Sequence, residues 1–181
     1  MAGDKIGDKI EGVLVDNERG LQVKIIDPPP SRQKNYWPLP AQELTVVEAL
    51  YLLYQGLLTL RDKEGKLLGF KEFLEIASRQ NPHTWVEFEV YLDLRKRNLL
   101  PVEGPRPRSF LLRKSKKEAI YTRYILILEE NTPVKIRSLV SFVEEARKNK
   151  WEPYVAIVDR YGDITYYKVS QIELESLKPM V

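Results

Sequence analysis

The stretch YVAIVDRYGDITYYKV, residues 154–169, decides the fold of the C-terminal half of the chain. YVAIVD (154–159) is a short apolar run, whereas DITYYKV (163–169) alternates apolar and polar residues. The residues between them combine acids with glycine, which is typical of a tight turn. The stretch therefore predicts two neighbouring β-strands joined in a hairpin.

The rest of this half alternates strand and helix signals. EGPRPRS (103–109), with two prolines and a glycine, is the best candidate for a domain boundary. After it, SFLLR (109–113) and YILILEE (124–130) are apolar enough for central strands, and QIELES (171–176) is a further strand. An amphipathic helix is expected between them, ending near RKNK, with these apolar positions: Ile136, Leu139, Val140 and Val143. Strands that flank a helix predict a compact α/β unit over residues 104–181.

The N-terminal half, residues 1–103, predicts a second and smaller α/β unit. KIEGVLVD (9–16) and LQVKIID (21–27) are strand-like and are joined by a turn, so they predict a hairpin. PPPSRQKNYWPLP (28–40) cannot form regular structure, because proline fixes φ and lacks a backbone donor. Three helices and one short strand follow, read from apolar spacing: a helix at 46–56, the strand at 57–62 and helices at 69–82 and 85–98.

Three local patterns predict where helices begin. Thr45 with Glu48 is a capping-box pair, in which each side chain bonds the backbone N–H of the other residue. Thr84 with Glu87 repeats that spacing. The Thr132-Pro133 pair places a capping residue before a first-turn proline. These patterns predict helix starts just after Thr45, Thr84 and Thr132.

The composition excludes several classes of site. The chain has 181 residues, a net charge of +3 and no cysteine, so disulfides and thiolate metal sites are absent. His83 is the single histidine, which excludes a multi-histidine metal centre; it is expected to be a solvent-facing turn residue. No apolar run spans a membrane and no signal core is present, so a cytoplasmic protein is expected. Charged residues at 30% with two methionines resemble thermophile proteins.

One basic stretch stands out against this mild overall charge. A single acid, Glu118, accompanies seven cations interleaved with aromatic residues: Arg106, Arg108, Arg113, Lys114, Lys116, Lys117 and Arg123. Such a pattern can bind a nucleic-acid backbone through charge and stacking. The same residues could equally form a solvated loop between strands, and the sequence leaves both interpretations open.

Catalytic chemistry has little support from residue types alone. A metal-dependent nuclease needs converging acids, and Asp159, Asp163 and Glu173 with Lys168 nearby are the candidates. Two of these acids flank a turn, however, where acids are common for structural reasons. Metal-free RNA cleavage needs a general base, and the usual one near neutral pH, histidine, is missing from this half. We expect no bound metal and no cofactor.

Three segments in order resemble the archaeal tRNA-splicing endonuclease family. They are VVEALYLLYQGLLTL (46–60), VEFEVYLDLRKRNLLPVEG (86–104) and the hairpin at 154–169. The resemblance covers about three quarters of the chain and implies a small N-terminal α/β domain followed by a nuclease-like C-terminal α/β domain with a mixed sheet. It also implies tetrameric enzymes that cut precursor tRNA at bulge–helix–bulge introns without a metal, using a Tyr, a His and a Lys.

The resemblance also indicates that at best one of those three catalytic residues remains. The family's Tyr ends a strand of the pattern FxvY; here the strand reads FLLR, and the position falls on Arg113. The His position, three residues before the strand that begins YIL, falls on Tyr121. The Lys position falls at or near Trp151, with Lys150 one residue out of register. The chain thus resembles a noncatalytic, structural subunit, two copies of which alternate with two catalytic subunits in a heterotetramer.

Such a subunit would have two tasks according to the resemblance. It would help to position precursor tRNA, for which the basic stretch is the candidate surface. It would also bind the catalytic subunit, by strand pairing of its closing hairpin and by inserting the acids of the DRYGD turn into a basic groove. The candidate partner-binding residues are Asp159, Tyr161, Asp163, Tyr166 and Tyr167.

Two alternatives remain open at this stage. The chain could be an active homotetrameric endonuclease that uses Lys150 and a relocated Tyr121, which Lys150→Ala would test. It could instead be a standalone RNA-binding protein without a partner subunit.

The proline-rich connector could contact partner or RNA through four residues: Arg32, Lys34, Tyr36 and Trp37.

Overall fold

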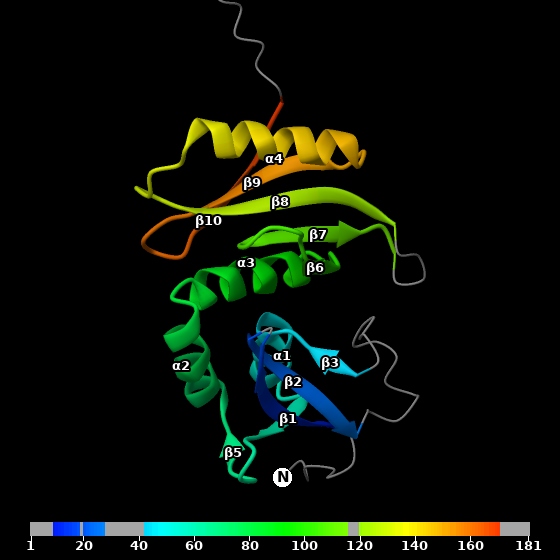
Figure 1. Cartoon of the computed structure of the whole chain (residues 1–181), viewed down its shortest axis with the longest axis vertical. Coiled ribbons are helices and arrows are strands. Elements are labelled where there is room, and N and C mark those ends of the chain that lie inside the picture. The colour runs from blue at the N-terminus through cyan, green and yellow to red at the C-terminus, as the bar shows by residue number, and fades with distance from the viewer. Residues whose placement is uncertain (1–8, 19, 28–41, 116–119, 171–181) are drawn as a thin grey trace, which may run out of the picture.

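Two α/β units stack along the long axis of the protein, with one helix between them (Figure 1). This computed structural model describes residues 9–170 except for residue 19 and the segments 28–41 and 116–119. Several predicted features therefore lie outside the described residues: the connector at 28–40, Lys116 and Lys117, and the strand at 171–176. The mixed α+β class and the two-part architecture are those expected from the sequence.

The N-terminal unit is built on a five-stranded sheet in the order β3-β2-β1-β4-β5. The predicted hairpin is confirmed, because the first two strands pair antiparallel. The fourth strand pairs parallel to the first. The bounds of these strands are β1 Ile10–Asn17, β2 Gly20–Asp27, β3 Glu43–Leu44, β4 Leu58–Arg61 and β5 Leu67–Leu68.

Helix α1 (Val46–Tyr54) begins where the sequence predicts. The backbone N–H of Glu48 donates to Thr45 Oγ1 at 3.4 Å, and the N–H of Thr45 donates to Glu48 Oε2 at 2.9 Å, so the capping box is confirmed. The helix is followed by Gly56 with a φ of 71°, a left-handed conformation that glycine adopts at little cost. Helix α2 (Phe70–Gln80) has its first-turn Glu72 bonded to the N–H of Gly69.

Helix α3 (Thr84–Lys96) corrects the second capping prediction. Thr84 is the first helical residue rather than the cap, and its hydroxyl donates to the carbonyl of Asn81 at 2.7 Å. The carboxylate of Glu87 accepts from the side-chain amide of Asn81 at 3.1 Å instead of bonding the cap backbone. Thr84 and Glu87 therefore each bond Asn81, whereas a capping box would have them bond each other's backbone N–H.

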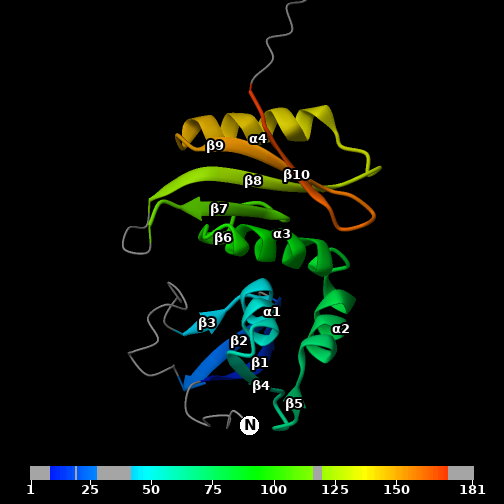
Figure 2. The ribbon, with the colours of Figure 1, turned by 180° about the vertical axis from the view of Figure 1, so that it is seen from behind.

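The C-terminal unit has a five-stranded mixed sheet in the order β10-β9-β8-β7-β6. Only β8 and β9 pair in parallel, and α4 (Ile136–Lys148) is the crossover between them. Helix α3 lies on one face of this sheet and α4 on the other (Figures 1 and 2). The strand bounds are β6 Pro101–Glu103, β7 Ser109–Arg113, β8 Tyr121–Glu129, β9 Glu152–Val158 and β10 Ile164–Lys168.

Helix α4 departs from its prediction in start and in face. It begins after Lys135, three residues later than the Thr132-Pro133 pair indicates. Its fully buried residues are Phe142 and Ala146, while Ile136 is 77% exposed. Leu139 and Val143 face the sheet as predicted, but Ile136 and Val140 do not, because the large Phe142 ring packs on Tyr124 and fixes the rotation of the helix.

Helix α3 joins the two units because it contributes to both cores. Phe88 and Leu92 belong to the core of the N-terminal unit. Val90, Tyr91 and Leu94 pack with the strands of the C-terminal sheet. A third core lies between α4 and the opposite face of that sheet. The shared helix therefore fixes how the two units are oriented, while a domain boundary at residues 103/104 stays a prediction.

Candidate functional site

The structure brings together, at one edge of the C-terminal sheet, the three positions at which the resemblance predicts replaced catalytic residues. Arg113 ends β7 and lies opposite Tyr121, the first residue of β8. The rings of Tyr121 and Trp151 are 6.4 Å apart between centroids and nearly perpendicular. Residues far apart in the sequence thus lie close together at this edge, and none of them carries an imidazole.

Lys150 has a structural explanation of its own. Its φ of 59° is left-handed, its N–H donates to the carbonyl of Arg147, and the N–H of Trp151 donates to that of Ala146. This pair of bonds is the Schellman motif, which satisfies carbonyls at the end of a helix. The backbone of Lys150 therefore terminates α4, and its side chain is exposed to solvent.

A second group of charged residues lies close to this edge, on the sheet face that also carries α3. It consists of four residues from three adjacent strands, which we call the cation–carboxylate cluster: Arg123, Glu152, Tyr154 and Lys168. Lys168 Nζ lies 2.8 Å from Glu152 Oε1, and Arg123 Nε lies 3.8 Å from Glu152 Oε2. The two cations lie 5.8 and 6.0 Å from the centre of the Tyr154 ring.

Sequence reasoning named two members of that cluster, Arg123 and Lys168, but for different sites and never together. Arg123 is part of the basic stretch, but Glu152 is its neighbour only through the parallel register of β8 and β9. Lys168 joins through the antiparallel register of β9 and β10, where it lies opposite Tyr154. Both pairs of neighbours are far apart in the sequence, so a single sequence does not reveal them. The alternation of charged and aromatic residues at the start of β9 is the one local signal that could have pointed to them.

The cations of the basic stretch that the structure describes do not form one continuous surface. Arg106 donates to Glu145 Oε2 at 2.5 Å and to Ser141 Oγ at 2.8 Å, so its guanidinium is bound to α4. Arg108 Nη1 lies 3.8 Å from Glu129 Oε1. These two arginines precede β7, whereas Arg113 and Lys114 lie at the other end of that strand. The two ends of β7 are four residues apart, which is roughly 14 Å along a strand. The described cations are thus divided between two ends of the sheet.

His83 contacts a carboxylate, which the sequence did not indicate. Its Nδ1 lies 2.5 Å from Glu129 Oε1, and its side chain is partly exposed. The contact ties the turn before α3 to the end of β8. The interpretation of His83 as a turn residue is confirmed, but its ring also links the two halves of the chain.

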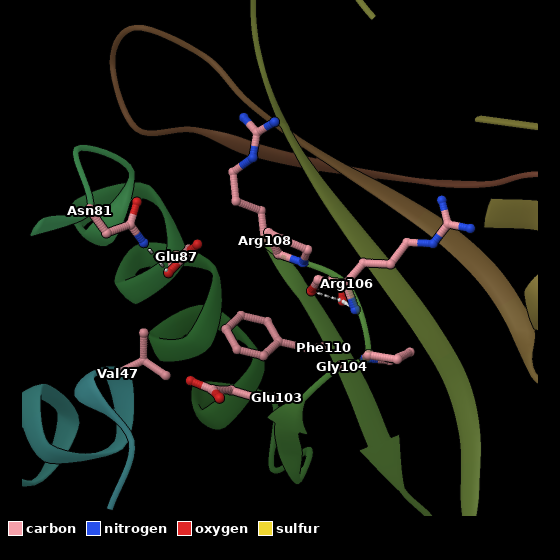
Figure 3. Close-up of a pocket in the computed structure, with 11 residues that line it drawn as sticks. Val47, Asn81, Glu87, Glu103, Gly104, Arg106, Arg108 and Phe110 are labelled. Atoms are coloured by element: carbon pink, nitrogen blue, oxygen red, sulfur yellow. Dashed lines mark hydrogen bonds between the residues drawn. The ribbon is translucent and has the colours of Figure 1, made fainter. Parts of the chain in front are cut away.

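A pocket of about 330 Å³ opens between the two units (Figure 3). Glu87 from α3 and Glu103 from β6 point toward it, while Arg106 and Arg108 point away from Glu103. Burial, and then repulsion from Glu48 and Glu87, raises the pKa of Glu103 to about 7. Glu103 is exposed to the pocket yet surrounded by protein, so the penalty on its charged form is smaller than for a sealed site. The lining carries no base and nucleophile in contact among the residues that the structure describes.

The closing hairpin assigns different roles to its two acids. Asp159 Oδ1 accepts from the backbone N–H groups of Tyr161 at 2.8 Å and Asp163 at 2.9 Å, so it holds the turn together. Asp163 is exposed, as are Tyr161 and Tyr167. Asp163 closes the turn opposite Asp159, and its exposed carboxylate is accessible to another molecule.

Tyr166 faces inward, in contrast to its neighbours. Its hydroxyl donates to Asp93 Oδ2 at 2.8 Å, and the guanidinium of Arg97 lies 5.5 Å from the ring centre. Burial, followed by the bond to Asp93, raises the pKa of the Tyr166 phenol. Tyr166 therefore fastens β10 to α3, which leaves its hydroxyl engaged within the chain.

The metal-site candidates do not assemble in the part of the chain that the structure describes. Within residues 9–170 and their stated gaps, no three acid or histidine side chains are grouped to hold a metal ion. Glu173 lies outside the described residues. Nor is any helix in that part long and apolar enough to cross a membrane.

Comparison with known proteins adds an independent line of evidence. The family model described as the tRNA intron endonuclease catalytic C-terminal domain matches residues 84–166, and that of the N-terminal domain matches residues 43–74. A tRNA-splicing endonuclease of Methanococcus maripaludis is 32% identical over 134 residues, which cover 72% of this chain and 76% of the relative. One from Pyrococcus horikoshii is 30% identical with the same coverage. One from Methanococcoides burtonii is 31% identical, and the match covers 74% of this chain but 38% of that longer relative.

Proposed function

The chain belongs to the tRNA intron endonuclease family, and from that membership we propose that it is the noncatalytic, structural subunit of a heterotetrameric tRNA-splicing endonuclease. Two copies would alternate with two catalytic subunits. The complex would act on precursor tRNA in the cytoplasm. This chain would contribute assembly and RNA positioning rather than chemistry.

The observation that supports this proposal is the identity of the side chains at the sheet edge. Cleavage of RNA through its 2′-hydroxyl needs a group that takes up a proton and another that gives one. Arginine stays protonated, and an indole exchanges no proton near neutral pH. Arg113 and Trp151 therefore cannot act as the base or the acid, and Tyr121 has no partner imidazole in the described chain. Cations without such a base can still hold a phosphate backbone.

The exposed tip of the closing hairpin supports the assembly role. Asp163 and Tyr161 project from the turn, and β10 is an edge strand that pairs only with β9 among the described strands. An unpaired strand edge is a template for pairing with another chain. A catalytic subunit with a basic groove is the partner that these features would fit.

A cleavage assay on a bulge–helix–bulge RNA tests the proposal. The full chain is assayed in EDTA, first alone and then mixed with a catalytic subunit of the family that is inactive by itself. We expect no cleavage by the chain alone and cleavage by the mixture. Cleavage by the chain alone that disappears in Lys150→Ala would overturn the proposal in favour of the homotetrameric enzyme. Absence of a stable complex would favour a standalone RNA-binding protein.

A further inference from the structure

The cation–carboxylate cluster is an exposed charged group that no step of the proposal above uses in full. Its three ionised side chains are between 45% and 58% exposed. They come from β8, β9 and β10, so the sheet fixes the positions of their backbones. Two cations and one carboxylate leave a net charge of +1 at this place.

Glu152 lies where an anion from outside would bind. One carboxylate oxygen accepts from Lys168, and the other lies near Arg123 and the Tyr154 hydroxyl, which is 3.4 Å away. These contacts, the bond to Lys168 first, lower the pKa of Glu152, so it is ionised at neutral pH. Arginine and lysine bind phosphate oxygens in the same manner as they bind carboxylate oxygens.

The Tyr154 ring gives the two cations a second contact that does not neutralise them. Both lie within about 6 Å of the ring centre. If Glu152 swings away, the ring still holds the ammonium and the guanidinium near one another. Ion pairs between exposed side chains are weak, so such a movement costs little free energy.

We propose that the cation–carboxylate cluster binds a phosphate group of the RNA backbone, and that Glu152 occupies the place of this phosphate until RNA displaces it. The inference rests on the proposed function, because it takes precursor tRNA to be the substrate of the complex. Glu152 would thus weaken binding at this cluster and favour an RNA that also makes contacts elsewhere.

Two described arginines of the basic stretch, Arg106 and Arg108, are less suited to this role. Arg106 is bound to both Glu145 and Ser141, and its side chain is 28% exposed. Arg108 is similarly covered and lies near Glu129. Releasing Arg106 would also cost its bonds to α4, whereas Arg123 and Lys168 would lose only a surface ion pair.

Glu152→Gln tests the inference, because it keeps the shape of the side chain and removes its charge. We expect the full-length variant to bind a labelled bulge–helix–bulge RNA about 2–5-fold more tightly, within the range that one exposed ion pair allows. The plot of log affinity against log salt should steepen by roughly 0.7–0.9, one further phosphate contact. Fluorescence anisotropy over a salt series measures both quantities.

A matched control separates local from overall charge. Glu75→Gln changes the net charge equally on the exposed surface of α2, in the other unit. We expect it to leave affinity within experimental error. In Glu152→Gln/Lys168→Ala the gain should disappear, and Lys168→Ala alone should weaken binding. Equal effects of Glu152→Gln and Glu75→Gln would overturn the inference, and so would weaker binding by Glu152→Gln, since Glu152 would then orient the cations.

The outcome is independent of the cleavage test. Binding is measured on the chain without a catalytic subunit, and assembly is measured by cleavage on mixing. Tighter binding by Glu152→Gln without activation of a partner would refute the structural-subunit role and keep the phosphate site. Activation of a partner with no effect of Glu152→Gln on RNA affinity would do the reverse.

Discussion

The position of Glu103 lowers the free energy of unfolding when its carboxyl group is ionised. Its pKa is raised to about 7 by burial and by two neighbouring glutamates. In the unfolded chain a glutamate titrates near 4.5, so the folded state binds the proton more tightly. Stability is therefore greatest below about pH 4.5 with respect to this group. It falls as the pH rises toward 7, and the penalty is then constant.

Glu103→Gln should stabilise the protein at pH 8 and leave it unchanged at pH 4. Because Glu103 is open to the pocket, we discount the penalty for solvent and expect a gain of about 1 kcal/mol, which is about 2–4 °C in melting temperature. Calorimetry at the two pH values measures the difference, with Glu75→Gln as the control for net charge. A lower melting temperature at pH 8 would mean that the Glu103 carboxylate makes a stabilising contact.

At the scale of the element, the closing hairpin combines a structural acid with an exposed one. The carboxylate of Asp159 accepts hydrogen bonds from two backbone N–H groups within the turn. Asp163 bonds Asp159 through its backbone N–H and carbonyl, and its side chain takes no part in those bonds. The sequence could not distinguish them, because both are acids beside a glycine turn. The structure distinguishes them, because the carboxylate of Asp159 accepts from two backbone N–H groups across the turn.

Replacing each acid with alanine should separate folding from assembly. Asp159→Ala removes two acceptor contacts and should cost about 1–2 kcal/mol of unfolding free energy. Asp163→Ala should leave the unfolding free energy within about 0.5 kcal/mol but weaken binding to a catalytic subunit. Urea titration and sedimentation of the mixed subunits measure the two effects. Unchanged assembly in Asp163→Ala would remove this residue from the proposed interface.

The elements also show which parts of the fold the sequence predicts well. Patterns that are satisfied within a few residues were confirmed, as in the first hairpin and the capping box of Thr45. The start of α3 was mispredicted because a competing local partner, Asn81, bonds both Thr84 and Glu87. The face of α4 was mispredicted because a tertiary partner, the ring of Tyr124, decides it. The cluster around Glu152 needs the register of three strands, which a single sequence does not specify.

At the scale of the whole molecule, α3 makes the two units depend on each other. It supplies Phe88 to the N-terminal core and Val90 to the core of the C-terminal sheet, and Val47 of α1 packs in that second core as well. Neither unit keeps its core complete without this helix. A shared element of this kind favours a single cooperative unfolding transition over two separate ones.

Cooperative unfolding can be tested with two core substitutions outside α3, one in each unit. Phe73→Ala acts in the N-terminal core, and Phe142→Ala acts between α4 and the far face of the sheet; both side chains are fully buried. Each should cost about 3–5 kcal/mol and lower one common melting temperature by about 6–20 °C. Amide hydrogen exchange should rise together in β1 and β8 in either variant. If Phe142→Ala instead gives two transitions, with β1 still protected after β8 exchanges, then α3 does not couple the units, and each folds on its own core.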